Sequence, residues 1–285
     1  MTQPLAQTLH ASIDIGANLT HARFAKDLAQ VISRAQQAHI SHIVVTGTSI
    51  AESTAAIALC QQYPHYLYCT AGIHPHDASQ FDAHNYEQLK QLASQPCVRA
   101  IGETGLDFNR NFSSPQQQIH AFEQQIALAI ELQPPLFLHE RDAHEKQLDI
   151  LKYYRPQLVN AVIHCFTGDK QQCFNYLDLD LHIGVTGWIC DEQRGQALRE
   201  CVAAIPPHRL MIETDAPYLS PKTQPKPKLA RKGRNEPCTL NYVAEAVARC
   251  SQREIDEVIQ QTAATSRLFF GLGLQAKAEA KPLRT

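Results

Sequence analysis

The sequence predicts a single-domain parallel α/β barrel, the TIM (β/α)8 fold. At 285 residues the chain has the length of one such barrel. Short apolar runs alternate eight times with polar segments of helical period, and polar residues end at least five of these runs. An open doubly wound sheet uses the same alternation and is the alternative. The barrel is favoured because its strands deliver their last residues to one common face.

The eight predicted strands are short runs rich in apolar residues, as is typical of parallel strands buried on both faces. They occupy residues 12–16, 42–46, 67–73, 98–102, 135–138, 161–165, 182–186 and 210–212. Pro115–Leu132 is the clearest helix between them, because its apolar residues fall at i, i+3, i+7, i+10 and i+11. Ser114 is a suitable N-cap for this helix, and Pro115 suits its first turn.

The predicted barrel runs from residue 12 to residue 272, between a flexible leader (1–11) and a disordered polar tail (273–285). One segment, Pro217–Pro237, is rich in proline, lysine and arginine and follows the eighth run. Segments of this length without periodicity are usually functional loops or disordered.

The composition limits the class of partner. The chain has 26 Lys and Arg against 28 Asp and Glu, so a charged partner must be recognised by a local patch. No apolar run approaches the roughly 20 residues that span a bilayer. Nine cysteines without a C-x-x-C pair fit a reducing compartment. We expect a soluble cytoplasmic protein without a membrane partner, and the sequence requires no more than a monomer.

Four side chains of metal-ligand type follow different apolar runs: Glu103, His139, His164 and Asp215. Each alone is more often an ordinary hydrogen-bonded residue, but four that end separate strands of a barrel would converge on one pocket. Carboxylates and imidazoles without a thiolate suit Mg²⁺, Mn²⁺ or Zn²⁺. The sequence therefore predicts a site for one or two divalent ions. Glycines beside Glu103 are expected to leave room for it to bridge two ions.

Catalysis is assigned to the eighth run. Glu213 and Asp215 share one strand face by the period-two rule, and only the more distal Asp215 is expected to reach the pocket. Because a metal ion can acidify a water molecule, Asp215 is the candidate to orient and deprotonate that water. His74 and His76 close the third run. His74 has a metal or substrate role or a structural one, and His76 is expected to contact a substrate phosphate.

Six ordered motifs resemble the TatD-type metal-dependent deoxyribonucleases, which are amidohydrolase-like TIM barrels. They are Asp14-Ile-Gly-Ala-Asn-Leu-Thr, Gly72-Ile-His-Pro-His, Gly102-Glu-Thr-Gly-Leu-Asp-Phe-Asn-Arg-Asn-Phe, His139-Glu-Arg-Asp-Ala, His164-Cys-Phe-Thr-Gly and Glu213-Thr-Asp-Ala-Pro-Tyr. The resemblance covers about residues 12 to 270. It implies a magnesium-dependent 3′ to 5′ exonuclease acting on single-stranded DNA, with RNA open as a second substrate, in DNA repair or nucleic-acid turnover. It also implies metal binding by Glu103, His139 and His164, with Asp215 as ligand or base.

The first run departs from one pattern of that family. Many members carry Asp-x-His-x-His there, whereas this chain has Gly16 and Asn18 at the histidine positions, a form shared by the branch that resembles TatD itself. Glycine cannot bind a metal, and asparagine offers a weaker oxygen. We expect one firmly bound ion and a second that is weak or arrives with substrate, with His74, His76 and Asn18 as candidate ligands.

A basic segment follows the eighth run and contains no acidic residue: Lys222, Lys226, Lys228, Arg231, Lys232 and Arg234. A cationic loop beside a barrel mouth can hold phosphates without reading bases, which suits a nuclease. A solvated surface loop is the alternative. Arg231, Arg234 and Arg141 are the predicted phosphate contacts, and Arg110 is a further candidate.

Two other functions stay open. A barrel hydrolase of a carbonyl substrate, such as a cyclic amide or an aminoacyl-tRNA ester, keeps the barrel and the metal. Such enzymes often need a carbamylated lysine or a complete pair of first-strand histidines, and neither is evident. A non-enzymatic binding protein would have lost a metal site, whereas all four strand-end ligands are retained.

Overall fold

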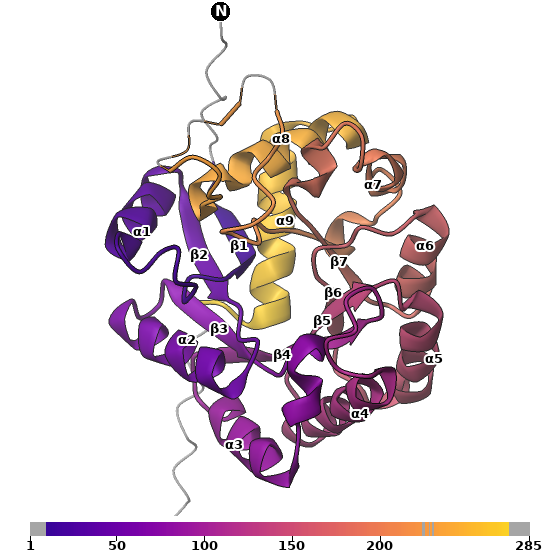
Figure 1. Ribbon diagram of the computed structural model, residues 1–285. Helices are drawn as coiled ribbons and strands as arrows, with labels where there is room; N and C mark the ends of the chain where they lie inside the picture. Colours follow the sequence, from indigo (N-terminus) through magenta and orange to yellow (C-terminus); the bar gives the residue numbers. More distant parts are fainter. Residues whose placement is uncertain (1–9, 224–225, 228, 230, 274–285) are drawn as a thin grey trace, which may run out of the picture.

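The computed structural model describes residues 10–223, 226–227, 229 and 231–273. Eight parallel strands follow one another in a single sheet in sequence order, with helices around them (Figure 1). The strands are β1 (Ser12–Ala17), β2 (Ile40–Val45), β3 (Leu67–Ala71), β4 (Val98–Asp107), β5 (Leu136–Arg141), β6 (Ala161–Ile163), β7 (His182–Val185) and β8 (Leu210–Ile212). A parallel bridge between Ala17 and Ala216 brings the two edges together, so the barrel is nearly closed. The predicted fold is confirmed.

Helices connect successive strands and cover the outside of the barrel. The α-helices are α1 (Leu28–Gln37), α2 (Ile50–Gln62), α3 (Ala83–Ala93), α4 (Pro115–Leu132), α5 (His144–Tyr154), α6 (Lys170–Asp178), α7 (Gln196–Val202), α8 (Leu240–Ser251) and α9 (Ile255–Phe270). The bounds of α4 are those predicted, and Ser114 forms a capping box with Gln117. Within the described residues, no helix has the length and apolar character needed to cross a membrane.

The fourth strand is longer than the sequence suggested and continues to Asp107. Its pairing with β5 shifts register between Ile101 and Thr104 and then resumes. Gly102 lies in this shift with φ +145°, and a Cβ atom there would lie 2.2 Å from the carbonyl oxygen of Phe137. This glycine therefore allows the close approach of β5. The expectation that the flanking glycines leave room around the Glu103 carboxylate stays a prediction.

The interior of the barrel is filled by apolar side chains, and α9 contributes to the same cluster. Inward-facing members come from seven strands: Ile13, Ile15, Val44, Tyr68, Ala100, Phe137, Val162 and Met211. Phe269 and Phe270 at the end of α9 pack against them. Because this filled interior keeps water out, polar chemistry is confined to the end of the barrel where the strand-to-helix loops lie.

The predicted leader and tail fall largely outside the described residues, which exclude 1–9 and 274–285. The first strand of the barrel, β1, begins at Ser12. After α9 the chain stays attached to the domain, because Leu272 is buried and the Gly273 N–H donates a hydrogen bond to the Tyr68 hydroxyl at 3.3 Å.

Candidate metal centre and active site

A cavity of about 650 Å³ opens among the loops that follow the strands. Its walls include every one of the four predicted strand-end ligands. They also include both predicted histidines of the third loop and the predicted Asn18 and Arg141. The other lining residues are Thr20, His21, Ala22, Thr46, Thr48, Glu52, Asp77, Glu140, Cys165, Thr167, Trp188, Tyr218 and Leu219.

Glu103 lines the cavity, and three imidazoles converge on one of its oxygens. Its Oε1 is 2.8 Å from His164 Nε2, 3.0 Å from His139 Nδ1 and 3.3 Å from His74 Nε2. These side chains come from four successive strands or the residues just after them. One carboxylate oxygen within reach of three imidazole nitrogens is a donor set that fits a divalent metal ion.

The pKa shifts in this cluster show that its carboxylates require nearby positive charge. Burial opposes ionisation of Glu103, yet the nearby His164 and His74 hold its pKa well below the usual range. Burial also opposes protonation of His164, but Glu103 and Glu213 raise its pKa well above the usual range. Protons on His139 and His164 therefore balance the carboxylates here, whereas burial lowers the pKa of His74. A divalent ion would supply that positive charge in their place.

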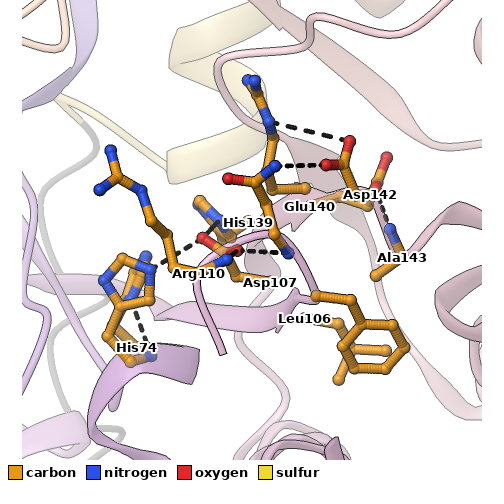
Figure 2. A network of polar contacts seen from close by, with 12 residues as sticks. His74, Leu106, Asp107, Arg110, His139, Glu140, Asp142 and Ala143 are labelled. Carbon is orange, nitrogen blue, oxygen red and sulfur yellow. Dashed lines mark hydrogen bonds and ion pairs between the residues drawn. The ribbon is translucent and has the colours of Figure 1, made fainter. Parts of the chain in front are cut away.

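A second carboxylate, Asp107, extends the cluster toward the third loop. Its Oδ2 is 2.8 Å from His76 Nε2 and 3.3 Å from His139 Nε2. Its Oδ1 accepts the backbone N–H of Arg110 at 2.8 Å. Figure 2 shows Asp107 beside His139 and Arg110. His139 thus contacts both Glu103 and Asp107. Sequence reasoning gave Asp107 no role, although the period of two along a strand places it on the same side as Glu103.

Asp215 also lines the cavity and comes three residues after β8. Asn18 donates its side-chain N–H to Asp215 Oδ1 at 3.0 Å, so the two edges of the barrel meet here. Burial raises the pKa of Asp215 to about 7; His164 opposes this rise and Glu103 adds to it. A carboxylate that binds a proton near neutral pH is suited to general-base chemistry.

Comparisons with known proteins agree with this arrangement. Residues 13–271 match the family described as TatD related DNase. The chain belongs to that family. A protein of Erwinia amylovora named "3'-5' ssDNA/RNA exonuclease TatD" is 50% identical, over 91% of this chain and 99% of its own. A protein of Citrobacter rodentium with the same name is 47% identical, over 92% of this chain and 99% of its own.

Solved structures give the same result. A TatD-family hydrolase of Entamoeba histolytica superposes with a TM-score of 0.82 at 25% identity, over 93% of this chain and 99% of its own. A TatD homologue of Escherichia coli K12 superposes with a TM-score of 0.81 at 28% identity, over 91% of this chain and 98% of its own. The prediction of a TatD-type metal-dependent hydrolase in a TIM barrel is confirmed.

In this TatD-family protein, Glu213 contacts His164 through the ring nitrogen that does not face Glu103. It is fully buried, and its Oε1 accepts the backbone N–H of Cys165 at 2.5 Å. Its Oε2 lies 3.4 Å from His164 Nδ1, so His164 is held between Glu213 and Glu103. As expected, Glu213 does not line the cavity. The contact between Glu213 and His164 joins segments that are distant in the sequence, so the sequence does not reveal it.

The departure of the first strand from the histidine pattern has a steric reason. A Cβ atom at Gly16 would lie 2.2 Å from Glu213 Oε2, so the Glu213 carboxylate occupies the space that a side chain would need. Only Asn18, at the end of this stretch, reaches the cavity. In this TatD-family protein the first strand therefore contributes an amide in place of two imidazoles.

Arg234, a predicted phosphate contact, is a buried structural residue. Its guanidinium donates to both oxygens of Asp27 at 2.7 and 2.9 Å and to Glu236 at 2.6 Å. It also lies 5.0 Å from the centre of the Phe24 ring, and the residue is 2% exposed. The structure contradicts the phosphate assignment, because the donors that would bind phosphate are occupied by carboxylates.

The rest of the basic segment is only partly free to bind phosphate. Lys222 and Arg231 face aspartates at 2.8 and 3.4 Å respectively, and Lys228 lies outside the described residues. None of the basic residues described from Lys222 onward lines the cavity. Arg141 does line it, with 42% of its side chain exposed and its guanidinium 5.9 Å from the Trp188 ring.

Proposed function

We propose that this TatD-family protein is an exonuclease that removes nucleotides from the 3′ end of single-stranded DNA and RNA. The observation that carries the proposal is the convergence of three imidazoles on Glu103, in a cavity that the Asp215 carboxylate also lines, with its pKa raised by burial to about 7. The names of relatives that share about half of the aligned residues support the substrate and the direction of digestion.

Glu103, His139 and His164 would hold the first divalent ion, which we propose to be Mg²⁺. His74 and Asp107 would hold a second, weaker ion together with His76. When bound, the ions polarise a phosphoryl oxygen and lower the pKa of a water molecule. Imidazole-rich sites also suit Mn²⁺ and Zn²⁺, so these ions are alternatives that the experiment below compares.

The chain's own side chains orient the reactants. Asn18 holds Oδ1 of Asp215, which leaves Oδ2 to accept the proton of the attacking water. Arg141 at the rim is placed to bind a backbone phosphate. The Trp188 ring beside it offers a face on which a base can stack, a contact that does not depend on sequence.

The test is a time course on single-stranded DNA and RNA labelled at either end, with Mg²⁺, Mn²⁺ or Zn²⁺ restored after chelation. Glu103→Gln and Asp215→Asn are expected to lose nearly all activity while staying folded by circular dichroism. Glu257→Gln makes the same kind of change in a half-exposed carboxylate on α9 and serves as the control. Full activity in either site variant would reject the assignment. Hydrolysis of a carbonyl ester without cleavage of either polymer would establish the alternative chemistry.

We also propose that the protein acts as a cytoplasmic monomer in DNA repair or nucleic-acid turnover. All nine cysteines are free thiols, which fits a reducing compartment. Light scattering during size-exclusion chromatography tests the monomer directly, since a dimer would double the measured mass.

A further inference from the structure

Three cysteines gather outside the barrel wall, away from the cavity. Cys60 belongs to α2, Cys69 to β3, and Cys97 directly precedes β4. Their sulfur atoms all lie within 4.8 Å of one another. Cys69 points into the outer layer of helices, whereas its neighbour Tyr68 belongs to the interior cluster. The cluster is therefore separated from the nuclease centre by the sheet.

The fold holds this cluster together through its own hydrogen bonds and packing. The Cys69 N–H donates to the Cys97 carbonyl at 2.9 Å, which fixes the two strands in register. Cys60 is 2% exposed and Cys69 is fully buried, so neither sulfur is free to swing away. Cys97 is only partly buried and leaves a route by which an ion and a water molecule can enter.

The sulfur positions suit a thiophilic metal ion. Zinc–sulfur bonds measure about 2.3 Å, which places the sulfurs around one ion roughly 3.8 to 4.0 Å apart. Three sulfurs within 4.8 Å of one another reach that arrangement by shifts of less than an ångström. Three protein ligands leave the fourth tetrahedral position to a solvent molecule.

We propose that Cys60, Cys69 and Cys97 form a Zn²⁺ site that is distinct from the nuclease centre. The ion joins α2 to β3 and to the start of β4, so its binding free energy adds to the stability of this side of the barrel. The site has a structural role, and the proposal is independent of the substrate that the barrel mouth hydrolyses.

The experiment uses the full chain with Glu103→Gln, which weakens metal binding at the barrel mouth. The protein is reduced, stripped with a chelator and titrated with Co²⁺, whose thiolate complexes show an intense charge-transfer band. The band is expected to saturate at one equivalent and to be displaced by Zn²⁺. Adding Cys97→Ser is expected to remove it, whereas Cys250→Ser, a partly buried cysteine outside the cluster, should leave it unchanged.

The melting temperature is a second measurement, which distinguishes loss of metal binding from loss of folding in the variants. Zn²⁺ is expected to raise the melting temperature of the Glu103→Gln protein and to leave that of Glu103→Gln/Cys97→Ser unchanged. The absence of a thiolate band in the protein with all nine cysteines would overturn the proposal, as would a full band in the Cys97→Ser variant. Nuclease activity with Mg²⁺ should survive Cys97→Ser in the otherwise unaltered chain, so failure here is distinct from failure of the proposed exonuclease.

Discussion

The contact between Glu213 and His164 predicts that Glu213→Gln weakens metal binding without unfolding the protein. Glutamine keeps the size of the side chain and one oxygen that can accept the Cys165 N–H. It replaces the carboxylate oxygen that lies 3.4 Å from His164 Nδ1 by an amide group. His164 then loses the negatively charged partner that orients its ring and increases its basicity toward a metal on Nε2.

The expected size of the effect follows from this contact. Loss of a carboxylate behind a metal-binding histidine typically lowers metal affinity or activity about 10- to 100-fold, which is about 1.4 to 2.7 kcal/mol. We expect this loss in metal affinity, because Glu213 does not line the cavity and cannot contact substrate. Activity at saturating metal should therefore return to within a few-fold of the parent.

The assay measures exonuclease rate against metal concentration after chelation, together with isothermal titration of the metal. Glu257→Gln is the control, since its side chain is 47% exposed and, within the described residues, pairs with Arg253 just before α9 and Gln261 on α9. An unchanged metal midpoint in Glu213→Gln would refute the reasoning. A loss of rate that no metal concentration restores would give Glu213 a direct part in the reaction.

Three further predictions concern the framework. Arg234→Gln is expected to cost about 1 to 3 kcal/mol of unfolding free energy in urea denaturation, because it removes charged hydrogen bonds to Asp27 and to the buried Glu236, which then keep only Arg34 and Arg231 among the cations described here; a phosphate contact would instead raise KM with stability unchanged. Gly16→Ala is expected to cost about 1 to 3 kcal/mol by displacing Glu213 and to weaken metal binding in the same assay; parental values for both would contradict the steric argument. Ser114→Ala is expected to cost about 1 kcal/mol in the same denaturation experiment through loss of the α4 cap, with metal affinity unchanged.

Much of the architecture is readable from local patterns. The alternation of apolar runs with helical segments predicts the barrel, because hydrogen bonding within a helix and the period of a strand depend on nearby residues. The bounds of α4 are correct because Ser114 and Pro115 mark its start unambiguously. The convergence of Glu103, His139, His164 and Asp215 follows from the geometry common to all barrels of this kind.

The partners of individual side chains could not be read in this way. Glu213 beneath His164, Asp107 between two histidines and the carboxylates around Arg234 all join residues distant in sequence. The sequence shows that Arg234 is charged, but its burial depends on how the segment after β8 folds back against α1.

By itself, then, the sequence determined the fold, the family and the candidate ligands of the proposed metal centre, since these depend on local periodicity and on motifs in a fixed order. Only the tertiary structure decided which groups orient those ligands, why position 16 has no side chain, and which cations are free to meet a substrate. It also brought Cys60, Cys69 and Cys97 together. Each of these depends on strand register and packing between distant segments, which set distances that no local pattern contains.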